Sequence, residues 1–135
     1  MANQIVSIEK WLYSVLSADS ALNTENGGRL VCRLAPEVTS LPLTVFANQS
    51  QGSIPSLGGR GISRDVYVVK MVGANDDMTL LQAGANRISA LLDDASGTQD
   101  GLLIRSKFDS SEAYIETRED GRFAHLGAFF RIVAS

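Results

Sequence analysis

The chain contains one histidine and one cysteine, so any mechanism built on these side chains depends on His125 or Cys32. A Ser-His or Cys-His mechanism, or a zinc site with histidine ligands, would need His125. We expect His125 to lie on a strand opposite Glu116, where a cross-strand pair accounts for it. Cys32 lies between Val31 and Arg33 in a predicted strand, and we expect it to be a small core residue rather than a nucleophile.

Two pairs of neighbouring carboxylates, Asp76–Asp77 and Asp93–Asp94, are the other groups that could bind a metal or exchange protons. They fall at opposite ends of one predicted helix, roughly 25 Å apart at 1.5 Å per residue. Within one subunit they therefore cannot converge on one ion or substrate. We interpret the first pair as acids of the first helical turn and the second as a solvated helix end.

The segment Gly58-Gly59-Arg60-Gly61 has the composition of a phosphate-binding loop, but it precedes a predicted strand rather than a helix. No helix N-terminus would then face an anion. The sequence also lacks the spacings of P-loop, dinucleotide-binding and serine-hydrolase motifs. An active site needs at least two reactive groups that converge in a cleft. We therefore predict no catalytic residue, no cofactor and no metal, and a binding or structural role.

Composition and charge narrow the class of protein and the kind of partner. Hydrophobic residues make up 44% and charged residues 20% of the 135 residues, as expected for one globular domain spanning residues 1–135. The net charge is −3 and the arginines form no run, so we predict weak, non-specific binding to DNA. No apolar run approaches the ~18 residues needed to cross a bilayer, and the N-terminus lacks a signal-peptide pattern. We expect no membrane association and a location in the cytoplasm of the cell that makes the protein.

Hydrophobic periodicity predicts two amphipathic helices. The first spans residues 3–17, and the second spans residues 75–94 with Gly97 as its terminator. The polar, glycine-containing stretch from Asp19 to Gly28 reads as a loop. Strands are predicted at 29–34, 43–49, 62–72 and 102–108. The buried stripes would be Ile5, Ile8, Leu12 and Val15 in the first helix, and Met78, Leu81, Ala85, Ile88 and Leu92 in the second.

The dipeptide Asp120-Gly121 predicts a hairpin with a two-residue turn of type I′. In that register Glu119 faces Arg122, Ile115 faces Leu126, Ala113 faces Ala128, Tyr114 faces Gly127 and Glu116 faces His125. The face that bears Glu116 and His125 also carries Phe123, Phe129 and Val133. We expect part of this face to be covered, because it is too apolar to remain in water.

The stretch from Ser50 to Gly61 fits no helix or strand and is the longest predicted loop. Its glycines and serines make it costly to order, yet it contains Ile54 and Leu57. It is either a solvated hairpin tip or an assembly loop that docks on a partner, with Arg60 as a rim charge. The candidate interface residues are Ile54, Leu57, Arg60, Phe123 and Phe129.

The order of elements predicts an α+β fold, with a mainly antiparallel sheet packed on one side by two helices. The size and this order resemble the tail terminator, or tail completion, proteins of long-tailed phages. The resemblance covers nearly the whole chain. It rests on Leu16-Ser17-Ala18-Asp19 at the end of the first helix, Arg29-Leu30-Val31, Ala35-Pro36, Leu41-Pro42-Leu43-Thr44-Val45, the strand Asp65 to Met71, the helix to Leu92, and the closing Phe129-Phe130-Arg131-Ile132-Val133.

This resemblance implies a non-enzymatic structural protein. It would form a hexameric ring that caps the head-proximal end of the tail tube, stops its growth and joins it to the head connector. The implied partners are further copies of the chain, the tail tube protein and a neck protein, with DNA passing through the channel without specific binding. The implied location is the tail of a virion, in siphovirus-like particles or gene transfer agents, assembled in the host cytoplasm. Alternatives are another neck component such as a head–tail adaptor, a small ligand-binding domain, or an enzyme completed by a partner chain.

Overall fold

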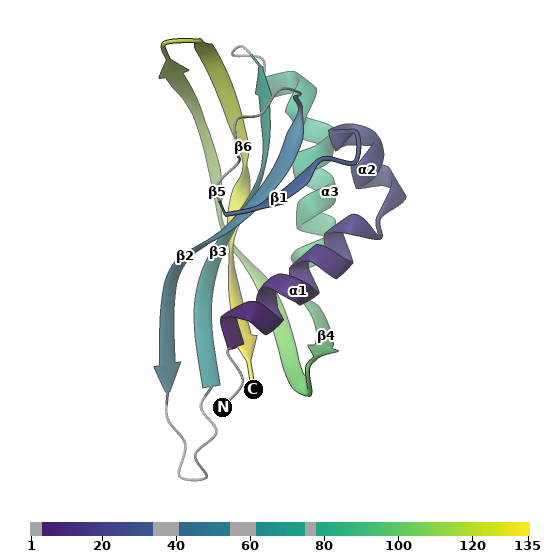
Figure 1. Cartoon of the computed structure of the whole chain (residues 1–135), viewed down its shortest axis with the longest axis vertical. Helices are drawn as coiled ribbons and strands as arrows, with labels where there is room; N and C mark the ends of the chain where they lie inside the picture. Colours follow the sequence, from purple (N-terminus) through teal and green to yellow (C-terminus); the bar gives the residue numbers. More distant parts are fainter. Residues whose placement is uncertain (1–3, 34–40, 55–61, 75–77) are drawn as a thin grey trace.

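The computed structural model describes residues 4–33, 41–54, 62–74 and 78–135; side chains at 50–54, 62 and 63 are outside this description. The described segments form one six-stranded sheet and a set of helices (Figure 1). In chain order the elements are α1 (Gln4–Ser17), α2 (Ser20–Asn26), β1 (Leu30–Cys32), β2 (Leu43–Ile54), β3 (Ile62–Ala74), the 3-10 helix η1 (Met78–Leu81), α3 (Gln82–Leu92), β4 (Ala95–Gln99), β5 (Leu102–Arg118) and β6 (Gly121–Ala134). No helix in the described ranges is long and apolar enough to cross a membrane.

The sheet has the strand order β1-β2-β3-β6-β5-β4. All neighbouring strands are antiparallel except β1 and β2, which are parallel. The fold is therefore α+β as predicted, but the sheet is mixed and the described helices include α2 as well as the two expected ones.

Helices α1, α2 and α3 lie on one side of the sheet (Figure 1). Their buried side chains form one core cluster with the sheet residues that alternate toward them, including Tyr67 on β3 and Phe130 on β6. The predicted stripes of α1 and α3 supply much of this core, because Ile8, Leu12, Ile88 and Leu92 are fully buried. We call the opposite side of the sheet the helix-free face.

Helix α2 was predicted as a loop, and that prediction was wrong. The Asp19 carboxylate caps the helix by accepting a hydrogen bond from the Leu22 amide at 2.9 Å. The Arg87 guanidinium on α3 donates two hydrogen bonds to the same carboxylate, at 2.8 and 2.7 Å. The hydrogen bonds from Arg87 lower the pKa of Asp19 to about 2. A short polar segment thus becomes helical because Asp19 caps its start and Gly27 its end, and Arg87 holds the Asp19 carboxylate in place.

Strand β4 was also missed, because Gly97 was interpreted as a helix terminator. Gly97 instead lies in β4, and a Cβ at this position would collide with the indole nitrogen of Trp11. The Asp100-Gly101 dipeptide then turns the chain into β5, with φ of 52° and 78°. These positive values at both turn positions are those of a type I′ turn. The segment also holds α1, because Ser7 donates to Asp100 Oδ2 at 2.8 Å.

The β5–β6 hairpin forms, but the predicted register was wrong by two residues. Arg118 pairs with Gly121, so Glu119 and Asp120 make the turn and only Gly121 has a positive φ, 138°. Tyr114 therefore lies opposite His125, and Glu116 lies opposite Phe123. A two-residue shift keeps every side chain on its predicted face, because alternation along a strand has a period of two.

The predicted loop over Ser50 to Gly61 is shorter than expected at its start. β2 continues to Ile54, which pairs with Ile62 on β3, and a bulge between Asn48 and Ser50 interrupts the register. Residues 55–61, including Leu57, Arg60 and the Gly58-Gly59-Arg60-Gly61 segment, lie outside the described residues, as do Asp76 and Asp77.

The close approach of β3 and β6 at Gly127 gives a test of the core of the fold. A Cβ at this position would collide with the backbone of Val69 and Lys70, which cannot rotate away. We expect Gly127→Ala to lower the free energy of unfolding by more than about 2 kcal/mol, measured by urea denaturation. The control is Ser111→Ala, at an exposed site on β5 opposite Ala128. It should change the free energy of unfolding by less than about 0.5 kcal/mol. Equal stabilities for the two variants would contradict this description of the β3–β6 contact.

Candidate interaction surfaces

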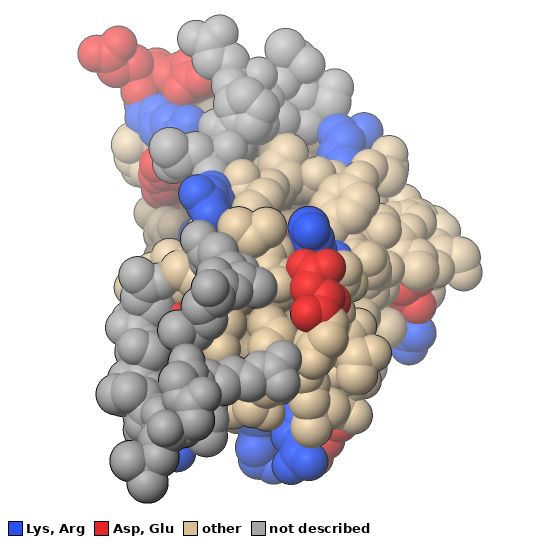
Figure 2. All heavy atoms as spheres, turned by 60° about the horizontal axis from the view of Figure 1, so that its bottom comes forward, with Lys and Arg blue, Asp and Glu red and all other residues tan. Residues whose placement is uncertain are grey.

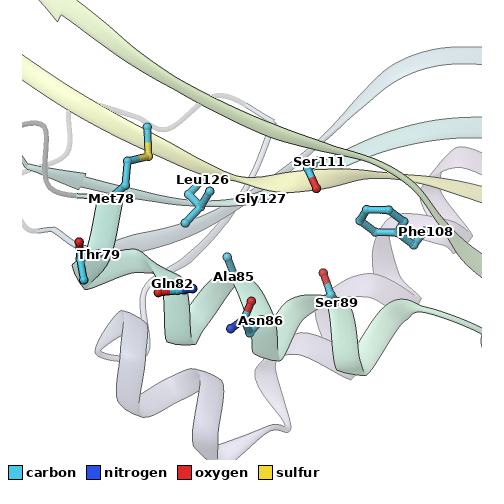
Figure 3. A pocket seen from close by; sticks show the side chains of 10 residues that line it. All are labelled: Met78, Thr79, Gln82, Ala85, Asn86, Ser89, Phe108, Ser111, Leu126 and Gly127. Atoms are coloured by element: carbon cyan, nitrogen blue, oxygen red, sulfur yellow. The ribbon is translucent and has the colours of Figure 1, made fainter.

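A groove separates η1 and α3 from the β5–β6 hairpin (Figure 3). Its volume is about 350 Å³. The helical wall and the strand wall both mix apolar and uncharged polar side chains, and no ionisable residue lines it. The groove can therefore accommodate an apolar or neutral polar group, but it offers no acid or base. Its lining residues are Met78, Thr79, Gln82, Ala85, Asn86, Ser89, Phe108, Ser111, Leu126 and Gly127.

Large exposed apolar side chains occur on the elements that form this groove. Leu80 on η1 is 74% exposed, and Ile115 lies 39% exposed on the same face of β5 as Ser111. Phe108 is 37% exposed and packs edge-on against the buried ring of Phe130, with centroids 6.1 Å apart. This side of the molecule thus presents apolar surface that an association partner could bury.

A polar ladder crosses the helix-free face of β3, β6 and β5. Lys70 Nζ donates to the hydroxyl of Tyr114 at 2.8 Å, and the Tyr114 ring stacks on His125 with centroids 4.3 Å apart. His125 Nε2 lies 2.8 Å from Glu116 Oε1. Glu116 in turn accepts two hydrogen bonds from Arg118, at 2.8 and 3.0 Å. We call Lys70, Tyr114, His125, Glu116 and Arg118 the polar ladder.

Contacts within the polar ladder hold His125, the only histidine of the chain, in a fixed position. Burial lowers the pKa of His125, because the imidazolium would lose its hydration, although the hydrogen bond to Glu116 acts in the opposite direction. The pKa of Glu116 is also lowered, first by the hydrogen bonds from Arg118. At neutral pH a neutral imidazole therefore donates Nε2–H to a carboxylate. The Nδ1 atom is buried and has no hydrogen-bond partner.

Positive side chains gather at the other end of the helix-free face. Arg64 and Arg105 flank Val133 on the neighbouring strands, and Lys107 lies beside Arg131. Lys107 forms an ion pair with Asp94 at 2.9 Å, and Arg131 forms one with Asp109 at 2.8 Å. Arg105, Lys107 and Arg131 help to line a second hollow of about 500 Å³. On the surface seen toward the lower end of Figure 1, basic and acidic side chains lie next to one another in several places (Figure 2).

The remaining candidates for chemistry lie apart from one another. Cys32 is exposed at the end of an edge strand, so the prediction of a core residue was wrong. Partial burial and the Glu9 carboxylate raise its pKa to about 11, so the thiol is protonated at neutral pH. Asp93 accepts a hydrogen bond from the Phe108 amide. The described ranges contain no cluster of three or more His, Cys, Asp or Glu side chains that could hold a metal.

The candidate interface residues fall into two groups in the structure. Phe123 and Phe129 are half-buried on the helix-free face, and the Arg118 guanidinium lies 5.1 Å from the Phe123 ring centroid. Ile54 ends β2, but its side chain is outside the described part, as are Leu57 and Arg60 altogether. The structure therefore locates the two phenylalanines and leaves their role in an interface a prediction.

Sequence reasoning missed the groove, Lys70, Tyr114 and Arg118. The His125–Glu116 contact was predicted as a directly opposite pair and is present as a diagonal one. With the correct register, Tyr114 would have been identified as the residue opposite His125. The groove could not be found from a local pattern, because its two walls come from separate segments of the chain.

Comparison with solved structures links this fold to a chain of a virus-like particle. No protein-family model matches the sequence, and no curated protein matches it. The chain is similar to a chain of a structure described as "Virion of native gene transfer agent (GTA) particle", with a TM-score of 0.72 and 17% sequence identity. The alignment covers 97% of this chain and 97% of that chain. At this identity the likeness establishes a shared fold.

The buried histidine predicts a specific dependence of stability on pH. Below the usual histidine pKa the unfolded chain binds a proton that the folded protein resists, so the free energy of unfolding decreases as pH falls. We expect the melting temperature to drop by roughly a few degrees between about pH 7.5 and about pH 5.5. His125→Gln, whose amide can still donate to Glu116, should lose less over the same interval. An identical drop in both proteins would show that His125 is not the group responsible.

Proposed function

We propose that this chain is a structural subunit of a phage-like particle, and that its copies form a ring that caps the head-proximal end of a tail tube. The supporting observation is the likeness of fold to a chain of a gene transfer agent virion over 97% of both chains. The order of elements also agrees with that expected of tail terminator proteins, including the opening helix α1 and the closing hairpin β5–β6.

The chemistry of the described residues favours an assembly role over catalysis. His125 Nε2 is hydrogen-bonded to Glu116 within the polar ladder, and the Cys32 thiol is protonated at neutral pH. Neither the groove lining nor the ladder brings two free reactive groups together. A protein that works by packing against copies and neighbours needs surface rather than reactive groups.

Exposed apolar side chains supply such surface on several elements. Val6 and Tyr13 on α1 are 43% and 53% exposed, and Leu80 on η1 is 74% exposed. In the proposed ring, neighbouring subunits or the tail tube bury some of these residues. Phe123 and Phe129, together with Ile54, Leu57 and Arg60, are the further contacts that we propose from the sequence.

The charge distribution suits a ring that DNA crosses without being held. Each copy has a net charge of −3, and Lys107 and Arg131 on the helix-free face are paired with carboxylates. Tight binding to DNA requires several cations free to contact phosphates at once. We therefore propose transit of DNA through the ring without specific binding.

The proposal is tested in the particle that encodes the chain. Removing the gene should leave tails of uncontrolled, excessive length that fail to join heads, seen by negative-stain electron microscopy, because nothing stops tube growth. Supplying the chain from a plasmid should restore both length and joining.

The alternative role of a head–tail adaptor gives a different phenotype. In that case tails of normal length would accumulate unattached, and the capping role would be wrong. Complete, infectious particles made without the chain would remove it from particle assembly altogether.

A further inference from the structure

The sheet has two open backbone edges, each beyond the end of a short flanking strand. β1 pairs with β2 only over Thr44–Phe46, and β4 pairs with β5 only over Leu102–Ser106. In the described part of the chain, no other strand pairs with these outer sides. Among the described residues, β2 therefore has no outer strand partner over residues 47–54, and β5 has none over residues 109–118. The two runs lie on opposite margins of the sheet, one toward the bottom and one toward the top of Figure 1.

The outward backbone groups of β5 can be assigned from the turn. Arg118 and Gly121 close a two-residue turn, so this pair exchanges both of its hydrogen bonds. Counting back by twos, Glu116, Tyr114 and Glu112 also bond to β6. The N–H and C=O groups of Ser111, Ala113, Ile115 and Thr117 then point away from the sheet. They form a regular row of donors and acceptors along the outer side of β5.

The open run of β2 lacks the charged residues and prolines that commonly block strand pairing. Natural edges are commonly blocked by lysine, proline or inward-pointing charges. Residues 47–54, Ala-Asn-Gln-Ser-Gln-Gly-Ser-Ile, contain no charged residue and no proline. Apart from the bulge between Asn48 and Ser50, the run carries none of the features that block strand pairing.

The two open runs match each other in direction. Along the order β2-β3-β6-β5 every neighbouring pair is antiparallel, so β5 runs opposite to β2. If the β2 edge of one copy lay against the β5 edge of the next, that contact would also be antiparallel. It would continue the alternation of the sheet from copy to copy.

The two open runs also match in offset. The centre of the β2 run, at Ser50, lies level with Arg131 on β6, through Val66. The centre of the β5 run, at Ala113, lies level with Leu126. The five residues between these levels correspond to about 17 Å along the strands, and four strand spacings to about 19 Å across them. This ratio corresponds to a strand tilt of about 40°, within the roughly 35–45° of sheets that close on themselves.

We propose that residues 47–54 of β2 add as a strand to residues 109–118 of β5 in a second copy of this chain. This inference rests on the proposed ring and names the contact that builds it. The contact joins two different edges, so a growing row of copies keeps one edge of each kind free at its two ends. Association therefore continues until the ring closes. Closure leaves neither of these edges open to unwanted pairing.

Thiol cross-linking tests the contact, because Cys32 is the only native cysteine and is exposed. In a Cys32→Ser background, the double variant Gln51→Cys with Ala113→Cys is treated with a short bis-maleimide, which tolerates a small difference in register. Denaturing gels should show a ladder of covalent multimers that ends at the closed ring. A mixture of the two single variants should give cross-linked dimers and nothing larger.

The single variants alone distinguish this contact from a two-fold dimer. Dimers from Ala113→Cys by itself would mean that β5 pairs with β5, and would overturn the proposal. Absence of cross-links in the double variant would overturn it as well.

Proline provides a second, independent measurement. Ala113→Pro removes an outward N–H that β6 does not use, so the subunit should keep its fold, checked by circular dichroism. Analytical ultracentrifugation should then show at least a tenfold loss of association, whereas Ala113→Val, which retains the N–H, should associate as the wild type does. Rings that form with Ala113→Pro would refute the edge contact while leaving the ring function intact. A ladder that never closes into a ring would support the edge contact and refute the ring.

Discussion

The pairing of β3 with β6 is the constraint on which the rest of the structure depends. It runs over twelve residue pairs, from Ser63–Ala134 to Ala74–Phe123, and joins segments far apart in the sequence. The strands β1 and β2 attach to the sheet only through β3, and β4 and β5 only through β6. Gly127 lies where a side chain would separate the two backbones. Without this pair the molecule would be two hairpins, each too small to bury a core of its own.

The pairing of β3 with β6 also determines which side chains meet on each face of the sheet. Toward the helices, Tyr67, Met71 and Phe130 are fully buried against α1 and α3, and this packing supplies most of the apolar burial. On the helix-free face, the alternate residues Lys70 and His125 hold Tyr114 and Glu116 of β5 in the polar ladder. The hydrophobic core therefore fixes the register, and the register brings the polar side chains together.

The sequence predicted the long elements with apolar periodicity and missed two short, polar ones, α2 and β4. The long periodic helix at residues 3–17 and the strand at 62–72 could be identified, because their apolar residues repeat at the period of the element. Helix α2 has local cap signals in Asp19 and Gly27, which were interpreted as loop residues. Strand β4 packs closely on the indole of Trp11, a contact that has no signal in the adjacent sequence. The Asp-Gly rule placed a type I′ turn at Asp120-Gly121, whereas Asp100-Gly101 adopts that geometry. The face of every hairpin residue was still correct, since a shift of two residues preserves alternation.

The candidate surfaces were less predictable than the fold, because each is produced by pairing between strands rather than by a motif. The groove combines η1 and α3 with two later strands, and the ladder combines three strands in one register. The open edges exist because β1 and β4 are three and five residues long beside partners of twelve and seventeen residues. A sequence shows strand lengths only approximately, and it does not show which long strand will lie beside which short one. Mismatch of strand length leaves hydrogen-bonding groups without partners, and in this sheet the mismatch occurs once at each margin. A subunit with one such edge could only pair in twos, whereas two different edges allow association to continue from copy to copy.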